Sequence, residues 1–410
     1  MAGNAAMKVA FVAHRANYLK HYGPIIDAAL ARGWVVECWL QDVSLGDKEY
    51  LRITPVMITE KWGQRVIVRL FEQPSDVAAL NAAHIPDAII SLHSRSTYMP
   101  APGTERFITL QHSVDLFAVN TVEQLASSDY VCLYTPFWLD YAVEYYAAVN
   151  GATREQVLAP LEAKLAYTGF AQMDAFGLID PDEVRTRWGI PQDKRVVLVL
   201  PLDLTGWPGL WPHFFQKTGL RQWYALWKAR KERGFVSTYW QWALKGWNDA
   251  RLAQAIKQFA ERNNAIMLIK GREKDLFRPA WSEHAFGTYY DDKHYPSTVF
   301  EAIAIADLCV LFYSTAVQEA VYANVPALCI DRPNKDIVKH HLWRRADVGG
   351  PYHFPGAVSW MSIPEAIQTL PATDLGVFVN DTQAREDYLA KFNGPADHRA
   401  CERILDLVTA

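Results

Sequence analysis

The sequence predicts an α/β fold of two Rossmann-like, doubly wound domains that face each other across a cleft. In the first half, an apolar, β-branched segment at 8–14 is followed by a helical stretch and then by a second apolar segment. This order is typical of a parallel sheet. The same rhythm restarts at 194–203, after a polar stretch that contains two prolines. The length of 410 residues also suits two domains better than one core.

We expect three parts in the chain: a first domain over 1–180, a second over 181–385, and a C-terminal helix over 386–410. The boundary lies at roughly 175–193, where the composition turns polar. Apolar, β-branched runs predict the strands in each half. After the opening strand they are 65–71, 87–94, 106–113 and 130–135, and then 194–203, 265–271, 307–313 and 325–331.

Composition excludes several classes of protein. The net charge is −4, from 41 Lys and Arg against 45 Asp and Glu, whereas a dedicated nucleic-acid binder is usually basic. The five cysteines are scattered, without a Cys-x-x-Cys pair, and are expected to be reduced core thiols of a cytoplasmic protein. No secretory signal is visible, and the longest apolar runs are strand-sized. We expect a soluble or peripherally attached protein.

One segment, an insertion at 204–248, departs from the βα rhythm. It holds seven of the 15 tryptophans and seven basic residues against one acidic residue between Trp207 and Trp247. Trp223 and Trp227 stand at helical spacing, with cations on other faces of that helix. This composition is typical of a helix in a membrane interface. A Trp-rich wall of the cleft, or a subdomain packed on itself, is the alternative.

Candidate residues of the first domain follow its predicted strands. Gln111 and His112 end one strand, at the edge of an open α/β sheet where ligands bind. Because its ordinary pKa is near neutral, His112 could take a proton from an attacking hydroxyl; a structural histidine is the alternative. His14, Arg15 and His21 are expected in the first loop, where an acceptor could bind. His93, Ser94 and Arg95 form a similar group at another strand end.

The second domain carries candidates for a phosphate site. Ser314 and Thr315 follow a predicted strand and begin a helix, whose free N–H groups suit an anion. Glu319 lies one turn further on, where a carboxylate could reach ribose hydroxyls. Lys270 and Arg272 stand at another strand end on the same side, so we expect these residues to outline a phosphate site. An ordinary Ser/Thr helix cap is the alternative.

Asp203 follows the first strand of the second domain and could be a base, a nucleophile, a hydroxyl anchor or a turn residue. The sequence contains no G-x-G-x-x-G after the first strand, no G-x-x-x-x-G-K-[ST] and no H-E-x-x-H. These absences disfavour a dinucleotide oxidoreductase, a P-loop ATPase and a zinc hydrolase. No D-x-D metal motif stands at a strand end. We therefore expect a transferase that uses neither a metal nor a cofactor.

The chain resembles the CDP-glycerol glycerophosphotransferase (teichoic-acid polymerase-like) family of the GT-B superfamily. Residues 111–114 resemble its Trp-His-Gly-Thr strand end, and 307–315 resemble its Asp-x-x-x-x-x-Asp-Tyr-Ser-Ser segment. The resemblance runs from about residue 107 to the end of the chain. The other similar segments are 127–141, 168–174, 182–203 and 392–408.

The resemblance implies a GT-B architecture, with His112 as general base and with Ser314 and Thr315 on the donor phosphates. Two positions depart from the family. Its second histidine, in Lys-Pro-His-Pro, is replaced at 270–273 by Lys-Gly-Arg-Glu, and the glycine after the first histidine is Ser113. If a sugar is transferred with retention, Asp203 is the candidate nucleophile.

We therefore expect a transferase that moves a sugar or polyol-phosphate group from a cytidine-nucleotide donor to a hydroxyl of a bacterial surface glycan. Its acceptor would be a glycan or lipid-linked molecule, bound by the first domain with help from His14, Arg15 and Gln111. The second domain would bind the donor. The expected location is the cytoplasm or the inner face of the plasma membrane. The alternatives are a UDP-sugar glycosyltransferase, a nucleotide-sugar 2-epimerase, and a non-catalytic GT-B scaffold that binds nucleotide or glycan.

Overall fold

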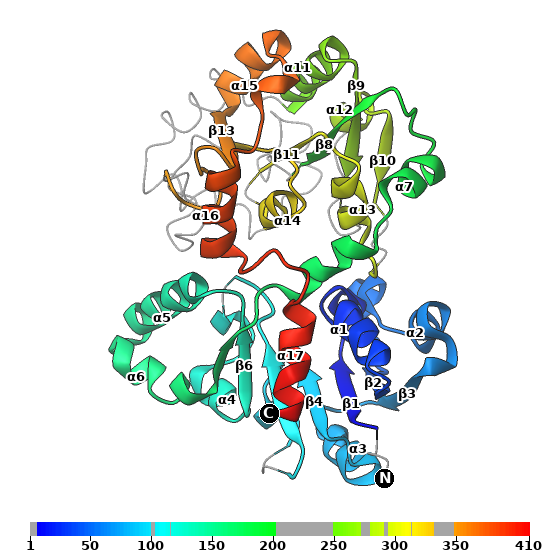
Figure 1. Cartoon of the computed structure of the whole chain (residues 1–410), viewed down its shortest axis with the longest axis vertical. Coiled ribbons are helices and arrows are strands. Elements are labelled where there is room, and N and C mark those ends of the chain that lie inside the picture. The colour runs from blue at the N-terminus through cyan, green and yellow to red at the C-terminus, as the bar shows by residue number, and fades with distance from the viewer. Residues whose placement is uncertain are drawn as a thin grey trace. The chain divides into compact units, whose positions relative to one another are not determined.

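The computed structural model describes residues 6–99, 103–114, 116–201, 249–271, 279–290, 294–312, 314–331 and 348–410. These residues form two compact units (Figure 1). Unit 1 comprises Met1–Ile179, Asp292–Phe300 and Glu386–Ala410, and unit 2 comprises Asp180–Asp291 and Glu301–Arg385. Asp203, Arg272 and the insertion at 204–248 lie outside the described residues.

Unit 1 is built on a parallel sheet of seven strands in the order β3-β2-β1-β4-β5-β6-β7. All its neighbouring strands are parallel, and β1 lies between β2 and β4, with Phe11 opposite Cys38 on one side and Ile90 on the other. The order of connection reverses between β1 and β4, which makes their carboxyl ends the topological switch point. The strands are β1 Lys8–Ala13, β2 Val35–Gln41, β3 Val66–Phe71, β4 Ala88–Ser91, β5 Arg106–Leu110, β6 Tyr130–Leu133 and β7 Leu165–Tyr167.

Helices accompany this sheet, and the chain's last helix returns to it. In α17, the backbone of Cys401 donates to Asp174 Oδ2 over 2.8 Å, and Arg106 Nη1 donates to Val408 O over 2.6 Å. Figure 1 shows α17 in red beside α1 in blue, which it contacts. The α-helices of unit 1 are α1 Leu19–Ala31, α2 Pro55–Trp62, α3 Asp76–His84, α4 Val122–Ala126, α5 Pro136–Asn150, α6 Arg154–Leu158 and α17 Ala400–Thr409. Its 3-10 helices include η1 Ala16–Tyr18, η4 Arg95–Thr97, η5 Leu116–Ala118 and η7 Ala171–Leu178.

Unit 2 repeats the plan with six parallel strands in the order β10-β9-β8-β11-β12-β13. Its core packs α11 onto the sheet through Phe259, Ile269 and Trp281, which are all buried. The strands are β8 Arg195–Leu200, β9 Ala265–Lys270, β10 Gly287–Tyr289, β11 Leu308–Leu311, β12 Ala327–Asp331 and β13 Val358–Ser362. The helices are α7 Pro181–Arg187, α11 Asp249–Arg262, α12 Pro279–Ser282, α14 Ala316–Tyr322 and α15 Ile363–Thr369. Two further helices contain residues of both units, α13 Thr298–Ala304 and α16 Thr382–Phe392.

Local sequence accounts for these elements. In β1 and β8, five of six residues are buried, because strands of a parallel sheet are covered on both faces. Helix α5 begins with Pro136 in its first turn, after the extended Thr135, and ends at Gly151 with a φ of 65°, where a residue without a Cβ is favoured. All five cysteines are free and buried, as predicted. The predicted fold class is confirmed, since both units are parallel sheets with interleaved helices.

Among the residues that the structure describes, no helix is long and apolar enough to cross a membrane. The strand expected over 106–113 ends at Leu110. Beyond it, the backbone N–H of Gln111 still donates to Cys132 O over 2.9 Å, while the Gln111 side chain donates to Ser113 O over 2.7 Å. This side-chain bond closes a turn, so the residues from His112 onward leave the sheet at its carboxyl edge.

Candidate functional site

Three segments of unit 1 meet at the carboxyl edge of its sheet. His14 follows β1, His93 follows β4 and His112 follows β5, and β4 lies between the other two strands. The ring centroids of His14 and His93 are 4.8 Å apart, and Tyr18 approaches His112 to 5.6 Å. We call this group the histidine cluster. Its members are His14, Tyr18, His21, His93, Tyr98 and His112.

His112 is a half-buried imidazole in this cluster. Its ring lies 5.7 Å from that of His21, centroid to centroid. Burial, with smaller contributions from the positive charges of Lys20 and Arg15, lowers the pKa of His112 to about 4. The ring is therefore uncharged at neutral pH and can accept a proton from a substrate hydroxyl. A general base must be unprotonated, as this ring is, and the lowered pKa also makes it a weaker base than an ordinary histidine.

Gln111 fixes the loop that carries His112. The residue is 2% exposed. Its Nε2 donates to Ser113 O over 2.7 Å, and its Oε1 accepts from the backbone N–H of Tyr134 over 2.9 Å. The hydroxyl of Tyr134 in turn donates to Gln111 O over 2.7 Å. Both ends of the amide are engaged inside the protein, so these contacts position the neighbouring histidine; acceptor binding by Gln111 stays a prediction.

His14 is also held from both sides. Its Nδ1 is 2.7 Å from Gln41 Oε1, and its Nε2 is 2.6 Å from the hydroxyl of Tyr98. Burial lowers its pKa. Arg15 next to it is exposed and makes no ion pair with any residue that the structure describes. Of the two predicted acceptor-binding residues after β1, Arg15 has the freedom to meet a ligand, whereas both nitrogens of His14 are occupied.

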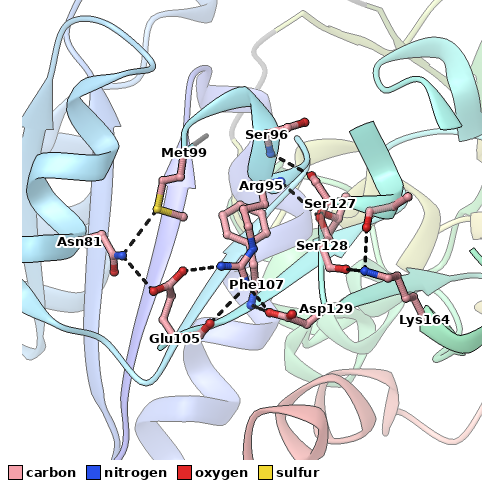
Figure 2. A network of polar contacts seen from close by, with 12 residues as sticks. Asn81, Arg95, Ser96, Met99, Glu105, Phe107, Ser127, Ser128, Asp129 and Lys164 are labelled. Carbon is pink, nitrogen blue, oxygen red and sulfur yellow. Dashed lines mark hydrogen bonds and ion pairs between the residues drawn. The ribbon is translucent and has the colours of Figure 1, made fainter. Parts of the chain in front are cut away.

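The group at 93–95 serves two purposes. His93 Nε2 lies 3.0 Å from the hydroxyl of Tyr18, within the cluster. Arg95, by contrast, is 3% exposed and forms ion pairs with Glu105, at 2.7 Å, and with Asp129 (Figure 2). Asn81 donates to the same Glu105 carboxylate over 3.0 Å. The buried guanidinium therefore anchors η4, the 3-10 helix after β4, and is a structural residue rather than a ligand contact.

His21 does not lie in the first loop, where the sequence placed it. The helix α1 begins at Leu19, so His21 stands in its first turn, facing His112. The loop is shorter than expected because η1 and α1 follow Arg15 directly. Sequence reasoning also missed Tyr18 and Tyr98. The spacing of Tyr18 and His21, three residues apart on one helical face, was the available signal for the first of them.

The donor-site candidates of unit 2 follow strands that flank β8. Lys270 ends β9 and is buried, with its Nζ donating to Gly271 O over 2.6 Å. Ser314 follows β11; its Oγ accepts from the backbone N–H of Ala316 over 3.3 Å. Thr315 is exposed, and Glu319 is buried in α14. Phosphate binding by these residues stays a prediction, as does any part played there by Arg272. No group of three or more described His, Cys, Asp or Glu residues could hold a metal ion.

The cluster predicts a pH-dependent stability. Burial lowers the pKa of His93 to about 3 and that of His112 to about 4, below the ordinary 6.5. Between pH 6.5 and 4 the unfolded chain therefore binds protons that the folded chain does not, so the free energy of unfolding falls as the pH falls. In urea titrations at pH 7, 6 and 5, the variant with His93→Gln and His112→Gln should lose stability less steeply than wild type. Equal slopes would contradict the prediction.

The two parallel sheets with their interleaved helices form a two-domain α/β fold that is consistent with the GT-B architecture. Solved structures match nearly the whole chain. The wall teichoic acid polymerase TagF matches with a TM-score of 0.55 and 12% identity, over 98% of this chain and 88% of its own. A putative UDP-N-acetylglucosamine 2-epimerase from Listeria monocytogenes matches with a TM-score of 0.53 and 12% identity, over 99% of this chain and 96% of its own.

The UDP-GlcNAc 2-epimerase from Methanocaldococcus jannaschii matches with a TM-score of 0.52 and 12% identity, over 98% of this chain and 99% of its own. No protein-family model and no curated protein sequence matches this chain. At such identities the structural matches establish the fold alone. They are nonetheless enzymes by name, a polymerase and two epimerases.

Proposed function

We propose that this protein is a GT-B transferase that moves a sugar or polyol-phosphate group from a nucleotide-activated donor to a hydroxyl. The observation that carries the proposal is His112, an uncharged imidazole at the carboxyl edge of the unit 1 sheet, in a fold shared over 98% of the chain with TagF. The exposed cation Arg15 lies close enough to lower the pKa of this imidazole. In such a transfer a base must take the proton of the acceptor hydroxyl while the nucleotide leaves the donor.

In the proposed reaction, His112 takes the proton of the acceptor hydroxyl as its oxygen attacks the donor. The bond to the nucleotide breaks, and the leaving nucleotide keeps the electron pair. Lys270 and Arg272, together with Ser314 and Thr315, would stabilise the phosphate charge, and Glu319 would bind the ribose. If transfer proceeds with retention, Asp203 would be the nucleophile that first receives the sugar.

We further propose a cytidine nucleotide as donor and a glycan or lipid-linked surface polymer as acceptor, at the cytoplasmic face of the membrane. The insertion at 204–248 would contact that membrane through its tryptophans and basic residues. This part of the proposal rests on the sequence resemblance and on the composition of the insertion.

A nucleotide-sugar 2-epimerase is the second candidate. Two structures named as UDP-N-acetylglucosamine 2-epimerases match 98–99% of this chain and 96–99% of their own. An epimerase would need a uridine nucleotide sugar and no acceptor. Incubation of UDP-N-acetylglucosamine alone, followed by product analysis, separates the two activities, because a transferase leaves the sugar's configuration unchanged without an acceptor.

A thermal-shift panel tests the donor class. CMP, CDP, UDP, GDP and ADP are each added with and without magnesium. A ligand at 100 times its dissociation constant should add about 2.7 kcal/mol to the free energy of unfolding. We expect a cytidine-selective shift that does not depend on magnesium. A uridine-selective shift would favour the epimerase or a UDP-sugar transferase, and no shift with any nucleotide would favour the non-catalytic scaffold.

A further inference from the structure

Helix α1 contains a buried histidine with an unused nitrogen. His21 is 5% exposed, and its Nε2 has no hydrogen-bond partner among the described residues. Four residues earlier, Asn17 in η1 has a shielded Oδ1 that also lacks a partner there. Burying such atoms without a bond costs free energy. Packing of unit 1 therefore does not explain these two polar groups.

The next residue on the helix shows the contrast. Tyr22 is buried as completely, but its hydroxyl donates to Val12 O over 2.9 Å and accepts from the backbone N–H of Leu92 over 2.8 Å. It thereby joins the ends of β1 and β4. The buried hydroxyl of Tyr22 is thus fully hydrogen-bonded within the fold, whereas Nε2 of His21 has no partner among the described residues.

His21 belongs to the face of α1 that meets His112. Asn17 stands in η1, which runs directly into α1, four residues before His21; since residues four apart are neighbours on an α-helix, we infer that the two side chains lie about one turn apart. The His21 ring lies 5.7 Å from the His112 ring, centroid to centroid. A ligand group that reached the two atoms would thus lie beside the proposed general base.

The chemistry of the pair selects the ligand group. Burial, reinforced by the charge of Lys20, lowers the pKa of His21 well below its ordinary value, so the ring is uncharged. A carboxamide oxygen is an acceptor only, and a neutral imidazole nitrogen either accepts or donates one hydrogen bond. Neither brings a positive charge for a phosphate. Hydroxyl groups, which donate and accept, satisfy both atoms.

We propose that Asn17 and His21 form a hydroxyl-binding subsite that holds a sugar or polyol substrate beside His112. Asn17 Oδ1 accepts from one hydroxyl, and His21 Nε2 bonds a neighbouring one. The inference deepens the proposed function and rests on it for the identity of the substrate. His21 would be a specificity-determining residue, and it would take no proton in the reaction.

The test measures binding and stability separately from turnover. Ligand-observed NMR titrations of the full chain use glycerol and propane-1,3-diol, which lacks the middle hydroxyl. Wild type should bind glycerol more tightly, and His21→Phe should reduce that preference roughly three- to tenfold, because one hydrogen bond is lost. The melting temperature of His21→Phe should be unchanged or higher, since an unpaired polar atom is removed. His21→Gln should restore part of the preference.

Tyr22→Phe is the matched control, because it removes a buried hydroxyl that is bonded within the fold. It should lower the melting temperature and leave the preference for glycerol unchanged. The proposal is overturned if wild type shows no preference, if His21→Phe keeps it, or if His21→Phe lowers the melting temperature as Tyr22→Phe does. These results do not depend on the nucleotide panel, so the subsite and the transferase proposal can fail separately.

Discussion

Replacing His112 with glutamine is expected to reduce donor turnover about 10²–10⁴-fold, the usual contribution of a general base. Glutamine keeps the size and polarity of the side chain, and Gln111 still holds the loop through Ser113 and Tyr134. The nucleotide-induced thermal shift should persist in the variant, because the proposed donor residues belong to unit 2. Initial rates with the donor identified by the nucleotide panel, at saturating acceptor, measure the effect.

His84→Gln is the control for this experiment. His84 ends α3 in unit 1, outside the histidine cluster, and its carbonyl accepts a bond from Lys8 Nζ that the substitution keeps. It should retain wild-type turnover. If His112→Gln turned over donor as fast as His84→Gln, His112 could not be the base. The transferase would then need another proton acceptor.

Replacing Arg95 with methionine is expected to destabilise unit 1 by about 3–5 kcal/mol, the usual cost of removing one partner of a buried ion pair. Glu105 would remain in the interior, with its side chain 3% exposed and with Asn81 as its remaining hydrogen-bond donor among the residues that the structure describes. Asp129 is partly exposed and would be hydrated. Urea unfolding followed by far-UV circular dichroism at pH 7 measures the loss.

The variant with both Arg95→Met and Glu105→Gln is the matched control. It removes the guanidinium together with the charge that would otherwise be left unpaired, and glutamine can still accept from Asn81. Its stability should lie clearly above that of Arg95→Met alone. If the two variants were equally unstable, the loss would come from the packing of the Arg95 side chain over the ring of Phe107, whose centroid is 5.5 Å from the guanidinium carbon.

Much of the fold followed from local sequence. The apolar runs that became β1 and β8 predicted buried parallel strands, since such strands are covered on both faces. Because ligand-binding residues of parallel sheets follow the carboxyl ends of the strands, the same reasoning placed His14, His93 and His112 at one edge. Pairing in the order β1-β4-β5 joins their segments. The hydrophobic pattern and the direction of the chain are therefore sufficient to predict the parallel strands and the sheet edge that carries these histidines.

The environment of each polar side chain was decided only by the tertiary structure. His14 and Gln111 looked equally available in the sequence, yet their polar atoms are bonded inside unit 1. Arg95 resembled a ligand contact, but residues 10 and 34 positions away, Glu105 and Asp129, enclose it.

His21, by contrast, was placed in a loop and stands in a helix beside His112, with a ring nitrogen that bonds no residue in the described part of the chain. Hydrogen-bond partners and burial depend on contacts between segments that are distant in sequence. The strand order of the sheet brings those segments together, and this order cannot be predicted from any local sequence pattern.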